Sequence, residues 1–179
     1  ARYGAPATAD STRAIAMGGY SPTSTPYTVN NIDYITIQSP GDAIDFGDMS
    51  TARENVAGCS DGSRGVWGGG HPSGSDIEYV TIGSPGNSID FGSLTRNNQT
   101  YATGDGSRGV FVMGIPTTNV IDYVTIGSTG NAIDFGDGTL ARYGAPATAD
   151  STRAIAMGGY SPTSTPYTVN NIDYITIQS

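Results

Sequence analysis

The sequence predicts an all-β protein built from small antiparallel sheets, and three observations lead to this prediction. First, residues 1–39 and 141–179 are identical. Second, a looser motif recurs about every 44–51 residues, which indicates that one supersecondary unit is copied and stacked. Third, only 13% of the residues are charged, 26 are glycine, and the β-branched residues come in short runs, as in turn-rich β proteins. The clearest part of the motif reads IDYITI from Ile32, IEYVTI from Ile77, IDYVTI from Ile121 and IDYITI from Ile172.

The second copy shows the order of elements within one unit. The turn signal CSDG precedes SRGVWGGG, a polar segment covers residues 71–76, and IEYVTI then alternates in the manner of a strand. The turn SPGN and the short strand SIDFGS close the unit. Each full unit therefore predicts about four strands joined by tight antiparallel turns. In the first copy, we expect these strands to start near Arg2, Arg13, Ile32 and Ala43.

The chain divides into one repeat domain, 1–179, with units 1–50, 51–94, 95–140 and 141–179. The last unit stops before its IDFGD strand, so we expect three full units and a partial fourth. We expect a neighbouring subunit or a continuing chain to supply that strand by backbone pairing at residues 172–179. Because the chain does not begin with Met and stops inside a repeat, we expect a mature product or a window on a longer repetitive chain.

Units of roughly 40–50 residues with four antiparallel strands are typical of the blades of a β-propeller. The chain resembles kelch repeats, with glycine doublets at Gly18–Gly19, Gly68–Gly69 and Gly158–Gly159. A tyrosine follows in the next strand (Tyr34, Tyr79, Tyr123, Tyr174), and an aromatic residue lies in the last strand (Phe46, Phe91, Phe135). Phe replaces the tryptophan usual in that family, and the third copy has VMG at Val112–Gly114. The identical segments 1–39 and 141–179 start 140 residues apart, and this period corresponds to three units, so two such periods would give a six-bladed ring.

A second resemblance concerns the phrases IDYVTI, STGNAIDFGD and SRGVF. They are similar to repeat regions of predicted structural and tail-fibre proteins of aquatic bacteriophages. This resemblance implies a role in a virion or an extracellular fibre, and it supplies no catalytic residue.

Composition and charge argue against several classes of partner. The net charge is −8, and all eight basic residues are arginines, so no cationic surface for nucleic acid or an anionic membrane is expected. No apolar run reaches the roughly 18 residues of a membrane-spanning helix. The single cysteine, Cys59, cannot form an internal disulfide. We expect no cofactor and no metal site.

The charged residues recur with the repeat, which favours a structural role over catalysis. One arginine column lies near the start of each copy, and a second lies before each glycine doublet. Two carboxylate columns accompany them. The functional alternative is a ring of carboxylates for acid–base work or metal binding, but the periodicity favours Arg–carboxylate pairing within and between blades. The columns are Arg2, Arg53, Arg96 and Arg142; Arg13, Arg64, Arg108 and Arg153; Asp33, Glu78, Asp122 and Asp173; and Asp45, Asp90 and Asp134.

The unrepeated residues offer few catalytic candidates. His71 is the only histidine, so we expect a surface residue rather than a base or a metal ligand. Cys59 stands where other copies carry threonine, which indicates a core filler. Asn98 begins an Asn-Gln-Thr glycosylation sequon. GDGSRG and FGDGT match neither P-loop nor EF-hand spacing, so we interpret them as turns.

The segment after each glycine doublet varies in length, and variable loops on one face of a repeat protein commonly form its binding face. The segment covers residues 20–31, 71–76, 115–120 and 160–171. The long version, YSPTSTPYTVNN, suits adaptable contacts to glycans or proteins; alternatively, it covers a blade edge or carries O-linked sugar. The candidate binding residues are Tyr20, Tyr27, Trp67, His71, Tyr160 and Tyr167. Trp67 also occupies the column of Met17 and of Phe111 or Val112, which favours a packing role.

These observations predict a non-enzymatic structural and adhesive repeat module of an extracellular or virion fibre, which self-associates into an oligomer or a filament through its repeat edges. The alternative is a glycan-binding lectin propeller that uses the loops after the doublets. Cell-surface glycans or proteins are the expected partners. A hydrolase or oxidase on the same scaffold would need an unrepeated set of catalytic residues, and the sequence offers none.

Overall fold

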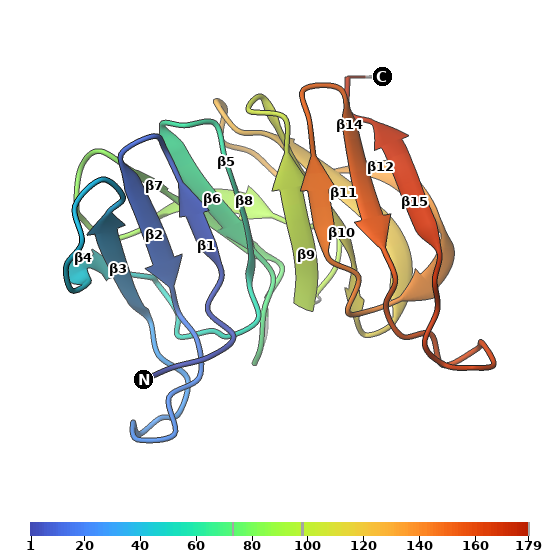
Figure 1. Ribbon diagram of the computed structural model, residues 1–179, viewed down its shortest axis with the longest axis horizontal. Helices are drawn as coiled ribbons and strands as arrows, with labels where there is room; N and C mark the ends of the chain where they lie inside the picture. Colours follow the sequence, from blue (N-terminus) through green and yellow to red (C-terminus); the bar gives the residue numbers. More distant parts are fainter. Residues whose placement is uncertain (73, 98, 179) are drawn as a thin grey trace.

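The computed structural model describes residues 1–72, 74–97 and 99–178, and its regular secondary structure is entirely β-strand (Figure 1). The strands form four antiparallel sheets, each made of strands consecutive in sequence. Blade 1 contains β1 (Ala7–Ala9), β2 (Arg13–Met17), β3 (Asn31–Thr36) and β4 (Ile44–Asp48). Blade 2 contains β5 (Ala57–Ser60), β6 (Arg64–Gly68), β7 (Asp76–Thr81) and β8 (Ile89–Ser93). Blade 3 contains β9 (Gln99–Gly104), β10 (Arg108–Ile115), β11 (Thr118–Thr125) and β12 (Ile133–Arg142), and blade 4 contains β13 (Ala147–Ala149), β14 (Arg153–Met157) and β15 (Ile172–Thr176).

The four small sheets are arranged in a ring and form a four-bladed β-propeller (Figure 1). The predicted all-β class and the antiparallel blade units are thus confirmed. The innermost strand of each blade faces a central cavity of about 630 Å³. Small side chains such as Ala7, Ala57, Ala102 and Ala147 line this cavity, one from each blade. The 179 residues supply four blades, not the six that two full periods would give.

Two elements differ from the expectation. The first strand begins at Ala7 rather than near Arg2, because Tyr3 pairs instead with Tyr20 in an isolated bridge and Gly4 turns the chain with φ of 66°. Residues 115–120 do not form a six-residue loop. Strand β10 extends to Ile115 and β11 begins at Thr118, so only a two-residue turn separates them. The third blade therefore lacks the projecting loop that its sequence predicted.

The turns between the first two strands of each blade are closed by an aspartate side chain. In blade 1, Asp10 Oδ1 accepts hydrogen bonds from the backbone N–H groups of Thr12 and Arg13, at 2.5 and 2.6 Å. These backbone donors lower the pKa of Asp10. Equivalent bonds are made by Asp61, Asp105 and Asp150. The GDGSRG segment is therefore a turn, as predicted.

Each blade has two faces, because successive side chains of a strand point to opposite sides of the sheet. We call the face toward the following blade the forward face and the face toward the preceding blade the rear face. In blade 1, the forward face carries Ile15, Met17, Ile32 and Tyr34, and the rear face carries Ala14, Ala16, Ile35 and Ile37. In blade 4, the identical sequence gives a forward face of Ile155, Met157, Ile172 and Tyr174 and a rear face of Ala154, Ala156, Ile175 and Ile177.

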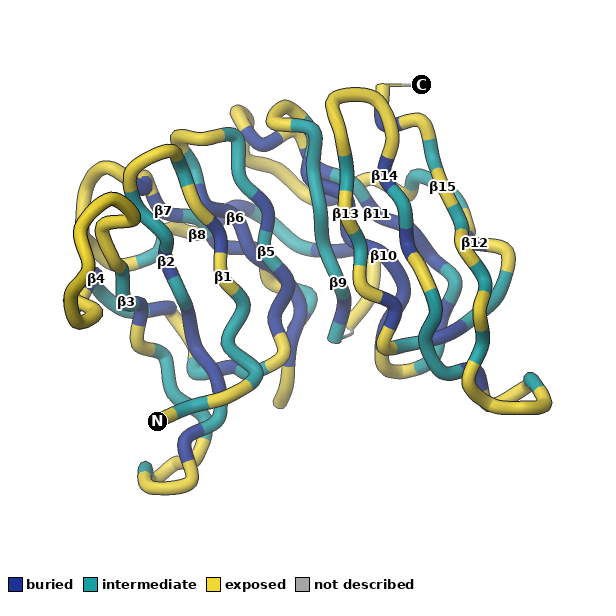
Figure 2. The backbone as a smooth tube through the Cα atoms, in the orientation of Figure 1, coloured by how far each residue is buried: buried dark blue, intermediate teal, exposed yellow. Residues whose placement is uncertain are grey.

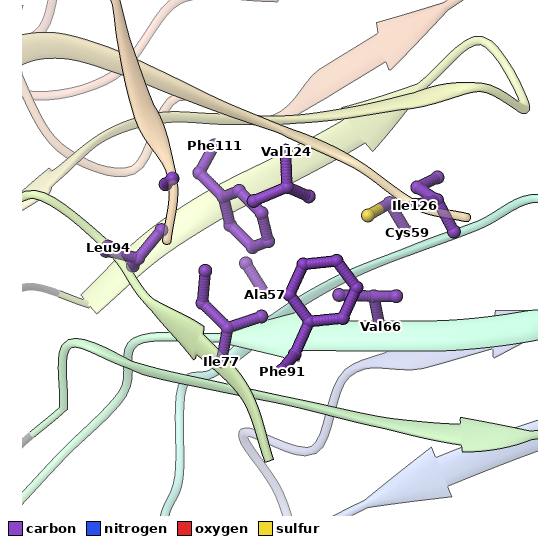
Figure 3. Close-up of a cluster of buried hydrophobic side chains, with 10 residues drawn as sticks. Ala57, Cys59, Val66, Ile77, Phe91, Leu94, Phe111, Val124 and Ile126 are labelled. Atoms are coloured by element: carbon purple, nitrogen blue, oxygen red, sulfur yellow. The ribbon is translucent and has the colours of Figure 1, made fainter. Parts of the chain in front are cut away.

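Three hydrophobic clusters join successive blades. Ile15, Met17 and Ile32 of blade 1 pack with Trp67 and Ile82 of blade 2. Blades 2 and 3 share a second cluster, shown in Figure 3, in which Phe91 and Val66 face Phe111 and Val124. The third cluster joins Val110, Val112, Met113 and Ile121 of blade 3 to Ala154, Ala156 and Ile177 of blade 4. Within the described residues, no cluster joins blade 4 to blade 1.

The glycine doublets allow the backbones of adjacent blades to approach. Gly18 and Gly19 have φ values of 58° and 112°, and Gly19 N–H donates to the Arg53 carbonyl of the next blade at 2.8 Å. A Cβ on Gly18 would lie 2.3 Å from that same carbonyl oxygen, so only glycine fits. In the second copy, the left-handed residues are Gly69 and Gly70, one position later than expected, because Gly68 belongs to β6.

Candidate functional site

The first arginine column pairs with carboxylates, as the sequence predicted. Arg2 contacts Asp33 at 2.8 Å, Arg142 contacts Asp173 at 2.8 Å, and Arg53 forms a short ion pair with Glu78. The Arg53 and Arg142 side chains have no exposed surface. The Arg53 guanidinium thus fixes the segment that enters blade 2 to β7 of that blade, and Arg142, at the end of β12, ties blade 3 to β15 of blade 4.

The third blade departs from this pattern. The Asp122 carboxylate accepts hydrogen bonds from the backbone N–H and the hydroxyl of Thr95, at 3.0 and 2.7 Å, and Arg96 does not form an ion pair with it among the described contacts. Burial raises the pKa of Asp122. Burial also acts on Asp173, but hydrogen bonds from Thr139 and Arg142 outweigh it and lower the pKa of that carboxyl. These carboxylates therefore hold the chain segment that enters each blade.

The second arginine column links each blade to the next. Arg13, Arg64 and Arg108 lie over Tyr34, Tyr79 and Tyr123, with guanidinium carbons 4.7–4.8 Å from the ring centroids. Each guanidinium also donates to the carbonyl of an isoleucine in the following blade: Arg13 to Ile82 at 3.1 Å, Arg64 to Ile126 at 3.2 Å, and Arg108 to Ile177. This column therefore binds tyrosine rings and backbone carbonyls rather than the expected carboxylates.

The remaining carboxylate column, Asp45, Asp90 and Asp134, is exposed and lies opposite Asp33, Glu78 and Asp122 in the sheet register. Within residues 1–72, 74–97 and 99–178, no group of three or more His, Cys, Asp or Glu side chains is placed to hold a metal ion.

Two unrepeated residues lie in the core. Cys59 is buried in the cluster between blades 2 and 3, as predicted for a filler, and burial raises the pKa of its thiol to about 12. Trp67 does not lie in a binding loop. It belongs to β6 and is fully buried against blade 1, so it cannot contact a ligand at the surface. Trp67 fills the rear-face position at which blade 1 has Ala16, which explains why its aromatic ring packs inside.

Four of the predicted loop residues come together in two tyrosine stacks. In blade 1, Tyr20 lies between Tyr3 and Tyr27, with ring centroids 5.0 and 5.4 Å apart. In blade 4, Tyr160 lies between Tyr143 and Tyr167, at 5.1 and 5.5 Å. Three of the four outer rings are open to solvent, because Tyr3 is 63% exposed and Tyr27 and Tyr167 are each 56% exposed, whereas Tyr143 is partly buried. Sequence reasoning missed Tyr3 and Tyr143, which enter the stacks through backbone bridges to Tyr20 and Tyr160.

The two long loops that carry these stacks project from the same side of the propeller, at the bottom of Figures 1 and 2. Hollows of about 310 and 500 Å³ adjoin the loops of blades 1 and 4. The hollow of blade 4 is lined largely by Ser, Thr and Asn, whereas Arg2 and Asp33 join Ser21, Ser24 and Asn31 in the hollow of blade 1. Exposed aromatic faces beside hydroxyl and amide groups suit contacts to sugars or to polar protein surfaces.

Blade 2 has a different pair at the equivalent position. His71 and Glu54 form the backbone bridge that two tyrosines form in blades 1 and 4, and His71 Nδ1 lies 3.6 Å from Glu54 Oε1. The His71 side chain is about half exposed, which fits the surface position that we expected. Asn98, the candidate glycosylation site, lies outside the described residues.

Comparison with known proteins adds no relative: no protein-family model matches the chain, and neither does any curated protein. The described residues contain no helix that is long and apolar enough to cross a bilayer. The four-bladed propeller with its two identical tyrosine loops is thus the feature from which a function has to be argued.

Proposed function

We propose that this chain is a non-enzymatic structural and adhesive repeat module that self-associates and displays tyrosine-rich loops from a rigid propeller. The resemblance of its repeat phrases to phage fibre proteins supports a place on a virion surface or outside the cell. The contacts made by the recurring charged side chains support a structural role. Arginines of both columns bind carboxylates, tyrosine rings or neighbouring backbone, and so serve the blades themselves.

The observation that carries the adhesive part is the pair of identical tyrosine stacks on one side of the ring. Two equal sites on one rigid body favour bivalent binding to a repetitive surface, because the second contact becomes intramolecular. Tyrosine rings in loops rich in Ser, Thr and Asn are suited to glycans or to polar protein surfaces.

The second candidate, a glycan-binding lectin propeller, is favoured by the same stacks and their adjacent polar hollows. A glycan array separates the two. Specific binding to a sugar that is lost in the Tyr27→Ala/Tyr167→Ala double variant supports the lectin. No sugar binding, together with ordered filaments in electron microscopy, supports the structural module.

A matched control for the array is the Tyr34→Phe variant, because Tyr34 packs on Phe46 and Arg13 inside a blade and away from the loops. The structural and adhesive proposal would be overturned by a chain that binds no surface, stays monomeric and turns over a substrate.

A further inference from the structure

The two copies of the 39-residue segment have opposite faces exposed. In blade 1, the forward-face residues Ile15, Met17 and Ile32 have no exposed surface, because blade 2 covers them. In blade 4, Met157 and Ile172, the equivalents of Met17 and Ile32, are 38% and 69% exposed, and Ile155 is partly exposed. Tyr174, the equivalent of the partly buried Tyr34, is 64% exposed. The forward face of blade 4 is therefore an open apolar surface, and the equivalent residues of blade 1 belong to the core.

The rear faces show the reverse. Ala154, Ala156 and Ile177 of blade 4 are 3%, 5% and 0% exposed, because they pack on blade 3. In blade 1, Ile35 and Ile37 are 43% and 48% exposed. The open rear face of blade 1 thus carries the first-copy equivalents of the residues that fill the junction between blades 3 and 4.

The polar contacts at the junctions give an independent match. Three junctions are closed in the molecule: blade 1 to 2, blade 2 to 3 and blade 3 to 4. At each of them, the arginine before the doublet donates to the carbonyl of an isoleucine in the next blade. The next arginine in this column is Arg153, which is exposed and lies over Tyr174 at 5.1 Å. In blade 1, the isoleucine that corresponds to these acceptors, Ile82, Ile126 and Ile177, is Ile37, which lies on the rear face. The two open faces therefore carry the donor and the acceptor of one more junction.

The side-chain volumes are also compatible. At the middle of the sheet, the three closed junctions pair Met17 with Trp67, Gly68 with Phe111, and Val112 with Ala156. A junction between the forward face of blade 4 and the rear face of blade 1 would pair Met157 with Ala16. This combination differs from the Val112–Ala156 pair only by a methionine in place of a valine, and methionine adapts readily to its surroundings.

We propose that the forward face of blade 4 binds the rear face of blade 1 of a second copy, head to tail, with Arg153 donating to the Ile37 carbonyl of that copy. The inference rests on the self-association in the proposed function and names the surface that performs it. The contact is heterologous, so it builds closed rings or open filaments, depending on the angle between successive copies.

Two charge substitutions test the two faces separately. Ile172→Asp places a carboxylate on the forward face of blade 4, and Ile37→Asp places one on the rear face of blade 1. Both positions are exposed in the single chain, so both variants are expected to fold, which circular dichroism and thermal melting verify. The matched control is Ile89→Asp, at a 55% exposed isoleucine in β8 that belongs to neither face.

Sedimentation velocity should show concentration-dependent association of the natural chain and of Ile89→Asp. Each face variant alone should have its self-dissociation constant raised at least about tenfold, because the junction would bury an unpaired charge. An equimolar mixture of Ile172→Asp and Ile37→Asp should restore one intact junction and form 1:1 dimers and nothing larger.

A natural chain that stays monomeric at roughly 100 μM, where even weak interfaces associate, would overturn the inference. So would face variants that associate as strongly as the control, or a mixture that does not form dimers. A monomeric chain that still binds through its tyrosine loops would overturn this inference alone and leave the adhesive function standing. A chain that assembles head to tail but binds nothing through those loops would instead overturn the adhesive part.

Discussion

Blades 1 and 4 share 39 identical residues, and comparing them separates what a sequence determines locally from what its neighbours determine. Strand register is the same in both, with Ala7 opposite Ala16 and Ala147 opposite Ala156. Both blades also form an arginine–aspartate pair at 2.8 Å. Burial, by contrast, is inverted: the forward face is core in blade 1 and surface in blade 4. Local structure thus follows the sequence, whereas membership of the core depends on which blade lies next to it.

The largest expected effect comes from truncating the same isoleucine in the two blades. Ile32→Ala should destabilise the fold by about 2–5 kcal/mol, because it leaves a cavity between blades 1 and 2. Ile172→Ala should change the unfolding free energy by less than about 0.5 kcal/mol, since its side chain is mostly in water. Urea unfolding of the dilute chain measures both values, and equal losses would show that the two faces are equally buried.

The next effect concerns the paired arginines. Arg142→Ala should cost about 2–3 kcal/mol, because it removes a fully buried guanidinium and leaves Asp173, whose side chain is only 10% exposed, without its counter-charge. Arg2→Ala should cost at most about 1 kcal/mol, since the Arg2 and Asp33 side chains are 17% and 37% exposed. Thermal unfolding of the two variants in parallel gives the difference, and a larger loss from Arg2→Ala would contradict the ranking.

A smaller effect concerns the pH dependence of stability, to which Asp122 of blade 3 and Asp173 of blade 4 contribute with opposite sign. Asp173 has a pKa below its usual value, so its contribution to stability is present above that usual value and is lost as pH falls through the folded-state pKa. Asp122 has a raised pKa, so its ionisation costs stability, and protonation at low pH relieves that cost. Asp173→Asn should therefore be more harmful than Asp122→Asn at pH 7, by about 1 kcal/mol, with the gap closing toward pH 3.

Carboxyl-carbon chemical shifts followed through an acid titration would check the two directions independently of stability. A titration midpoint for Asp122 below that of Asp173 would contradict the assignment of burial to one residue and of hydrogen bonding to the other.

Much of the fold could be predicted from the sequence, because the repeat fixes the unit and the alternation of IDYITI fixes its strands. The faces could not be assigned in the same way. Trp67 was both a packing candidate, from its column with Met17, and a candidate binding residue beside the glycine run; it continues β6 and faces the core, as the packing interpretation predicted. Only the pairing of β6 with β7, which places Trp67 opposite Glu78, determines on which side the ring points.

The candidate site was predicted in part. Tyr20, Tyr27, Tyr160 and Tyr167 were identified from loop composition, and the structure places them in two stacks. Tyr3 and Tyr143 were missed because they lie far from the loops in sequence and reach them through single backbone bridges. The loop of the third blade was overpredicted, because its length alone did not reveal that β10 and β11 continue almost to the Pro116–Thr117 turn.

The most direct test of the central claim is the alkylation rate of a cysteine placed at the same position in the two copies. The native Cys59 thiol is buried and has a pKa of about 12, so it stays unreactive near neutral pH. In dilute solution, the Ile172→Cys variant should react with iodoacetamide at nearly the rate of a free thiol. The Ile32→Cys variant should react at least about 100-fold more slowly, because its thiol becomes accessible only through local opening. Similar rates at the two positions would contradict the claim that identical residues are core in one blade and surface in the other.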